Sequence, residues 1–89
     1  KETSSSAAQV SIYPNPSTGH FTVSAVLNHN NEYTTQLTNV IGQVIYSETV
    51  RNISTFKKQF TTADLKTGVY FFIITDQNGA NSVSKVIIE

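Results

Sequence analysis

Strand-length runs of β-branched and aromatic residues recur along this chain, and turn-forming residues separate them roughly every ten positions. From this spacing we predict seven strands, at 10–13, 20–27, 33–40, 43–49, 53–60, 69–76 and 81–88. Residues 28–31 form a loop by composition, and Ile41-Gly42 and Gln77-Asn78-Gly79 form hairpin turns, the second of type I′. The sequence therefore predicts an all-β fold, a seven-stranded antiparallel β-sandwich of the immunoglobulin-like or jelly-roll-like kind.

A rigid corner is expected between the first two strands, where Tyr13-Pro14-Asn15-Pro16 is followed by Gly19. Each proline fixes its own φ and lacks an N–H, and the residue before a proline is held extended. Gly19 can adopt a positive φ where the next strand begins. The chain should therefore turn here without helix.

Alternation along the strands sorts apolar side chains into an inner and an outer set. The inner set on the second and sixth predicted strands is Phe21, Val23, Ala25, Tyr70, Phe72 and Ile74. Further core residues are expected to be Ile12, Leu37, Val44, Phe60, Leu65, Val86 and Ile88. The sixth strand is apolar on both faces, because Val69, Phe71 and Ile73 fill the other side, so it should be central or covered by a partner.

Bulk composition narrows the function classes. With 89 residues the chain forms one domain, and six Lys and Arg balance six Asp and Glu without a basic stripe, which disfavours nucleic-acid binding. The absence of cysteine excludes a disulfide framework and a thiolate nucleophile. No apolar run approaches the roughly 18 residues that span a bilayer, so we expect a soluble domain without membrane insertion.

Residues 1–9 are small and polar and include three consecutive serines, which is the composition of a linker. We expect a flexible linker at 1–9 that joins a missing domain, and a folded domain at 10–89. No charged segment followed by an apolar segment opens the chain, so any export signal should lie elsewhere in the parent protein. The sequence is therefore interpreted as a fragment.

Candidates for chemistry are few. His20 precedes a strand and His29 lies in an Asn-rich loop, and both are interpreted as surface residues. Four of the six carboxylates are scattered one to a segment, at Glu32, Glu48, Asp64 and Asp76. No calcium loop or phosphate-binding glycine loop is present in the sequence. We therefore expect no enzyme activity, no metal site and no cofactor.

Four segments of the chain form a recognisable pattern: Tyr13-Pro14-Asn15-Pro16 with Gly19, Asn39-Val40-Ile41-Gly42-Gln43-Val44, Asp64-Leu65 with Gly68-Val69-Tyr70, and Lys85-Val86-Ile87-Ile88. Taken together and in this order, they resemble the C-terminal sorting domain of the type IX secretion system of Bacteroidetes, in its type A form. The resemblance extends from about Val10 to Glu89. At Asn39 family members often have Asp, which changes the charge of that hairpin.

The resemblance implies a non-catalytic address label at the C-terminus of an exported protein. Such a protein crosses the inner membrane with a signal peptide, its sorting domain folds in the periplasm, and the outer-membrane translocon recognises it. The residues implied in recognition are Pro14, Asn15, Pro16, Gly19, Gly68, Tyr70, Lys85, Val86, Ile87 and Ile88. For each of them, and above all for Gly68 and Tyr70, a purely structural role is the alternative.

The resemblance also implies that a sortase-like cysteine peptidase removes the domain and can couple the cargo to an anionic lipopolysaccharide, so the cargo reaches the cell surface or the medium. The cut is expected in the linker, at Ser4, Ser5, Ser6, Ala7 and Ala8. Whether the domain dimerises stays open.

Two other functions are also compatible with the sequence. An accessory binding module of a secreted hydrolase, fibronectin-like or carbohydrate-binding, would be favoured by a concave strip of aromatic residues. A purely structural spacer would work equally well inside a chain as at its end. Translocation of a fused reporter would favour sorting over both.

Overall fold

The computed structural model describes residues 8–61 and 65–89, without the side chains of residues 8, 28–31, 52 and 53. Five strands make up most of this part of the chain: β1 (Ala8–Tyr13), β2 (His20–Asn39), β3 (Val44–Thr61), β4 (Gly68–Asp76) and β5 (Asn81–Ile88). The strands pair antiparallel throughout, β1 with β2, β2 with both β3 and β4, and β4 with β5.

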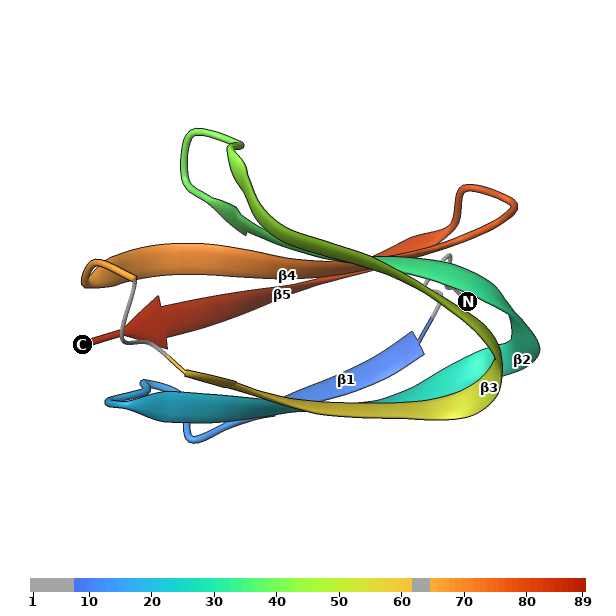
Figure 1. Ribbon diagram of the computed structural model, residues 1–89, viewed down its shortest axis with the longest axis horizontal. Coiled ribbons are helices and arrows are strands. Elements are labelled where there is room, and N and C mark those ends of the chain that lie inside the picture. Colours follow the sequence, from blue (N-terminus) through green and yellow to red (C-terminus); the bar gives the residue numbers. More distant parts are fainter. Residues whose placement is uncertain (1–7, 62–64) are drawn as a thin grey trace, which may run out of the picture.

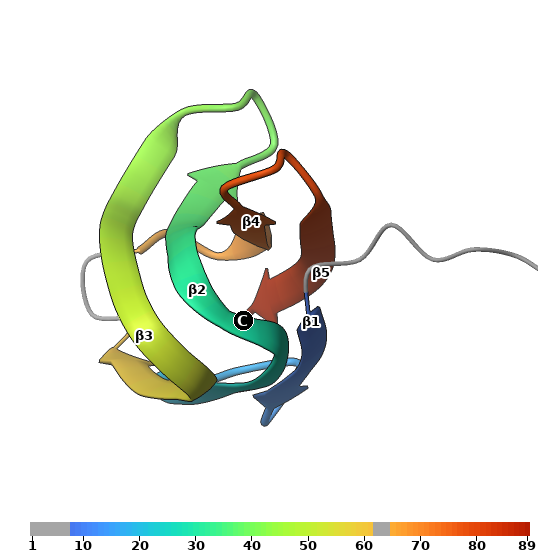
Figure 2. The ribbon, with the colours of Figure 1, turned by 90° about the vertical axis from the view of Figure 1, so that its right-hand side faces the viewer.

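The two longest strands, β2 and β3, bend and cross from one layer of a sandwich to the other (Figures 1 and 2). One layer holds β1, the first half of β2 and the second half of β3, which pair at Val10 with Ala25 and at Ala25 with Phe56. The other layer holds the first half of β3, the second half of β2, β4 and β5, in that order. The predicted antiparallel β-sandwich is confirmed: all seven predicted segments are strands, and β2 and β3 contain two each.

The predicted loop at 28–31 is wrong, because the backbone stays in β2 through these residues. The register of β2 against β3 shifts between Val26 and Asn31 and again before Tyr33, so the bend is made by irregular pairing. The pairing of Asn31 with Ile53 keeps the backbone extended despite its polar composition. The chain also enters β1 earlier than expected, at Ala8.

The core between the layers contains the whole inner set predicted from alternation. Leu37, Val86 and Ile88 are buried as expected, and Ile12, Phe60 and Leu65 pack against the core while partly exposed. Sequence reasoning missed Leu27, Tyr33 and Phe56, which are buried as well. The core is therefore larger than predicted on the bent strands.

Val44 was expected in the core, but it is 54% exposed. Tyr46 lies opposite Leu37, whereas Val44 lies opposite Thr38, so β3 carries an extra residue between these two pairs. This bulge reverses the alternation and turns Val44 to the outer face. The correction moves one apolar side chain from the interior to the surface.

β4 is central, as its apolar composition indicated, because it pairs with β2 on one side and β5 on the other. Its outward side chains Val69, Phe71 and Ile73 are half-buried. They face away from the core, beside the outward residues of β5.

The two short hairpins share one hydrogen-bond pattern. In the β2–β3 hairpin, the side-chain oxygen of Asn39 accepts from the N–H groups of Ile41 and Gln43, and Gly42 N–H donates to Asn39 C=O. In the β4–β5 hairpin, the Asp76 carboxylate accepts from the N–H groups of Asn78 and Ala80, and Gly79 N–H donates to Asp76 C=O. Because the Gly79 N–H bonds to Asp76, the type I′ turn predicted at Asn78-Gly79 is wrong, and the hairpin is a longer one with Gly79 at φ 91°.

Candidate functional site

Residues from three of the four segments that carry the family resemblance meet at one end of the sandwich, where β5 finishes and β4 begins (Figure 1). Gly68 pairs with Ile88, and Tyr70 pairs with Val86. The corner between β1 and β2 reaches the same place, because Ser17 forms a parallel bridge with Ile88. Three segments that are far apart in sequence therefore form one site, which we call the motif end: residues 14–19, 68–70 and 85–88.

Asn15 holds the edge of β5 with its side-chain amide. Its oxygen accepts a hydrogen bond from Ile87 N–H at 3.0 Å, and its Nδ2 donates to Lys85 C=O at 2.9 Å. These are the main-chain groups that a further strand beside β5 would use. The prolines on either side of Asn15 fix the neighbouring backbone, so this one side chain takes the place of a strand at the edge.

Ser17 continues this edge with its main chain. Its N–H donates to Ile87 C=O at 2.8 Å, and its C=O accepts from Glu89 N–H at 2.9 Å. The side chain is fully buried, and its hydroxyl donates to Pro14 C=O at 2.5 Å. The sequence around Ser17 carries no signal for this contact with β5.

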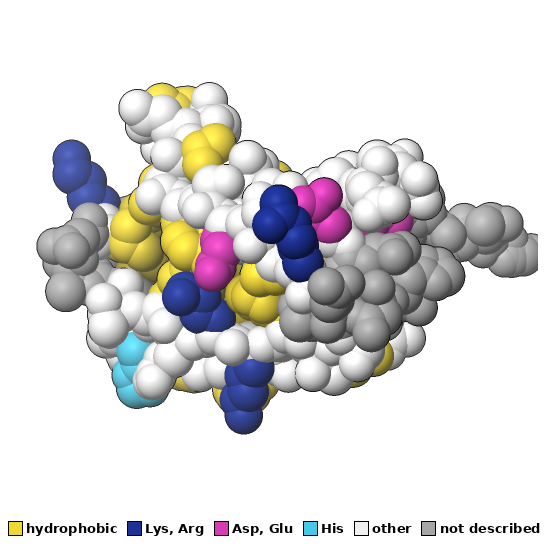
Figure 3. All heavy atoms as spheres, turned by 45° about the vertical axis from the view of Figure 1, so that its right-hand side comes forward, with side chains coloured by type: hydrophobic (Ala, Val, Ile, Leu, Met, Phe, Trp, Pro, Cys, Tyr) yellow, Lys and Arg dark blue, Asp and Glu magenta, His cyan; other side chains and the backbone are white. Residues whose placement is uncertain are grey.

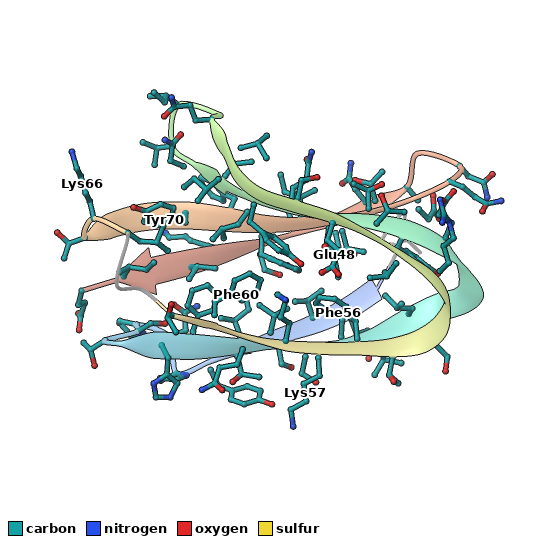
Figure 4. All side chains as sticks on the ribbon, viewed as in Figure 1. Glu48, Phe56, Lys57, Phe60, Lys66 and Tyr70 are labelled. Atoms are coloured by element: carbon teal, nitrogen blue, oxygen red, sulfur yellow. The ribbon has the colours of Figure 1, made fainter. Side chains whose placement is uncertain are left out.

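Gly19, Gly68 and Tyr70 shape the motif end. Gly19 has a φ of 92°, as predicted for the start of β2, and Gly68 has a φ of 150° at the start of β4. The ring of Tyr70 is buried, and its hydroxyl donates to Lys66 C=O at 2.7 Å, which ties the segment before β4 to the core (Figure 4).

The terminal strand shows two different sides. Val86 is completely buried and Ile88 is 3% exposed, so both belong to the core. Lys85 is exposed and Ile87 is half-buried on the opposite face. A partner that binds the folded domain can therefore contact Lys85 and Ile87, whereas Val86 and Ile88 fix the position of the strand in the core.

A second cluster lies along β3, where apolar side chains are visible at the surface between charged ones (Figure 3). Phe60 stacks on Phe21 with ring centroids 5.1 Å apart and meets Tyr46 edge-on at 4.9 Å. The Lys58 ammonium lies 5.5 Å from the Tyr46 ring centroid and 5.8 Å from that of Phe60. Phe56 and Phe60 point between the layers, whereas the neighbouring Lys57 points outward (Figure 4).

Tyr46 carries the one pKa shift in this cluster. Its hydroxyl donates to the carboxylate of Glu48. Burial of the ring, followed by the hydrogen bond and charge of Glu48, raises the pKa of Tyr46 to about 12. The phenol therefore stays neutral at physiological pH, and the cluster is a packing feature that includes a cation–π contact.

Residues 8–61 and 65–89 contain no group of three or more His, Asp or Glu that could hold a metal ion. No pocket opens among the described residues. No helix in that part of the chain is long and apolar enough to cross a membrane. The side chain of His29, Asp64, and Ser4–Ala7 of the expected cleavage region lie outside the described residues, while Ala8 is the first residue of β1.

Comparison with known families agrees with the arrangement of these motifs. Residues 11–89 match the family described as the secretion system C-terminal sorting domain. The match covers nearly the whole chain and includes every residue of the motif end. No curated protein matches the chain. The chain belongs to the family of type IX secretion system C-terminal sorting domains, the signals that direct secreted proteins through the outer membrane.

Proposed function

We propose that the outer-membrane translocon recognises this domain in its folded form, through the motif end. The observation that carries the proposal is the contact of Asn15 with Lys85 and Ile87, which joins the two motifs farthest apart in sequence. A linear signal would not need such a contact. Recognition of the assembled site explains why the corner, the start of β4 and the terminal strand occur together in one domain.

The domain acts as an address label and performs no catalysis. In support, no pocket opens among the described residues, and none of their His, Asp and Glu side chains form a group of three or more. The polypeptide upstream is the cargo, and the domain determines where that cargo goes.

The proposed route leads from the periplasm to the cell surface or the medium, where a sortase-like peptidase removes the domain. The expected cleavage region, Ser4–Ala8, lies next to the first strand. Ala8 already pairs with Leu27 in the sheet. Because a peptidase cleft needs an extended and unpaired segment, the cut bond should lie on the N-terminal side of Ala8.

The test is a fusion of a signal peptide, a fluorescent protein and residues 1–89, expressed in type IX-competent cells and in otherwise identical cells without the translocon. We expect fluorescence outside the competent cells only, and the mass of the released reporter should place the cut within residues 4–8. Reporter retained in both cells, or exported from both, would contradict the proposal. A matched fusion that ends at residue 9 controls for leakage.

A further inference from the structure

The outer face of the β4–β5 pair is largely apolar and is continuous with the motif end. Val69 lies opposite Ile87, Phe71 opposite Lys85, and Ile73 opposite Val83. Directly paired residues of antiparallel strands share a face, so these side chains form one surface. Val83 is 57% exposed, and the three side chains of β4 are half-buried. We call this surface the Lys85 face.

Lys85 is the one charged residue at the paired, outward positions of this layer. On β4 and β5 these positions are 69, 71, 73, 75, 81, 83, 85 and 87, on β2 they are 34, 36 and 38, and on β3 they are 44, 47 and 49. The ion pair found among the described residues is Arg51 with Glu32, at the bend. Lys85 therefore presents an ammonium without an anionic partner in the described part of the chain.

We propose that the Lys85 face docks on a protein surface that places a single carboxylate within an apolar patch. This inference rests on the proposed function and specifies the chemistry of the partner surface. The carboxylate would pair with the Lys85 ammonium, while the surrounding apolar side chains exclude water and strengthen the pair. Charge complementarity with a lone cation selects an acidic group over a basic one.

The single charge also favours a protein over an anionic lipid surface as the partner. Attraction to anionic membranes depends on clusters of several Lys and Arg, each of which adds a modest increment. The Lys85 face offers one cation and several apolar side chains, the composition of a protein contact.

Asn15 prepares this face for docking. By accepting from Ile87 N–H and donating to Lys85 C=O, it holds the backbone from which both outward side chains project. A strand that is fixed before binding loses less conformational freedom when the partner arrives. The internal contact and the external surface therefore belong to the same stretch of β5.

The charge is tested by export of the reporter fusion carrying Lys85→Arg, Lys85→Met or Lys85→Glu, each first shown to melt like the parent. Lys57→Glu is the control, because Lys57 is also exposed but lies on the first layer, in the pair with Ser24. We expect normal export with arginine, several-fold less with methionine, and a loss of about tenfold or more with glutamate, whose charge repels the carboxylate.

The apolar part is tested with a second matched pair, Val83→Ser and Val26→Ser. Val83 is 57% exposed on the Lys85 face, and Val26 is 58% exposed on the outer side of the first layer, opposite Gln9. The two changes should affect stability alike, but Val83→Ser alone should reduce export several-fold.

Export of Lys85→Glu and Val83→Ser at the level of their controls would overturn this inference and leave the proposed function intact. Failure of the unsubstituted fusion to leave the cell would overturn both. Normal export with Lys85→Met, while Val83→Ser behaves like Val26→Ser, would also overturn it, because the surface would then act through neither its charge pair nor its apolar contact.

Discussion

The side-chain oxygen of Asn15 accepts a hydrogen bond from the main-chain N–H of Ile87 at 3.0 Å, across 72 residues of sequence. The same amide reaches Lys85 C=O, so one side chain occupies the edge of the terminal strand. An open strand edge invites pairing with other chains. The corner between β1 and β2 therefore closes this end of the sandwich and protects the edge of β5 from pairing with other chains.

Replacement of Asn15 by alanine should release this edge without disrupting the core. Two hydrogen bonds disappear, and because water can reach the freed groups we expect a loss of about 1 to 2 kcal/mol in the free energy of unfolding. Amide hydrogen exchange should accelerate at Ile87. Exchange at Val86 should change less, because its N–H lies on the side that faces β4. Unchanged protection of Ile87 would mean that the contact does not form in solution.

Adjacent phenylalanines of β4 should respond differently to truncation. Phe72 is fully buried, so Phe72→Ala should cost about 3 to 5 kcal/mol through lost burial and the cavity left behind. Phe71 is half-buried on the outer face, and Phe71→Ala should cost about 1 to 2 kcal/mol. Denaturant unfolding of both variants measures the difference. Similar costs at the two positions would contradict the assignment of the faces.

The neighbouring lysines of β3 offer a second matched pair. Lys58 lies over the rings of Tyr46 and Phe60, so Lys58→Ala should lose its cation–π contact and the packing of its stem, about 1 kcal/mol together. Lys57 points outward, and Lys57→Ala should stay within about 0.5 kcal/mol of the parent. Thermal melting compares the two, and equal effects would show that the ring contacts contribute nothing.

The raised pKa of Tyr46 predicts a change of stability at high pH. The folded state keeps the phenol proton up to its raised pKa of about 12, whereas the phenol of the unfolded chain has its ordinary pKa of 10.0. The stabilising contribution is thus complete below pH 10 and is lost as the pH rises through about 12. In Tyr46→Phe the free energy of unfolding should therefore fall less between pH 10 and 12 than in the parent, which denaturant unfolding across that pH range measures. An identical alkaline loss in the variant would assign it to other groups.

Local patterning predicted much of the fold, because alternation is a property of neighbouring residues. Phe21, Val23, Phe72 and Ile74 lie inside as that pattern indicates. It failed where pairing overrides composition: the polar stretch at 28–31 continues β2 because β3 pairs across the bend. It failed again at Val44, because a bulge opposite β2 reverses the faces and leaves no mark in the sequence of β3 itself.

The candidate site was only partly accessible to sequence reasoning. The motifs identified the segments of the motif end, but the contact of Asn15 with β5 depends on how distant segments meet in the sandwich. At Asn39, by contrast, contacts within the hairpin explain why asparagine can stand where family members often have Asp. Its side-chain oxygen makes the same two main-chain contacts as the carboxylate oxygen of Asp76 in the other hairpin.

Export of the Asn15→Ala fusion, compared with Asn39→Ala, tests most directly whether the assembled motif end is the sorting signal. Both changes remove an asparagine side chain that accepts main-chain hydrogen bonds, but only Asn15 contacts the terminal strand. With both variants folded at the assay temperature, we expect Asn15→Ala to reduce the fraction of reporter outside the cell several-fold, while Asn39→Ala leaves it near the parental level. Equal export of the two variants would contradict it.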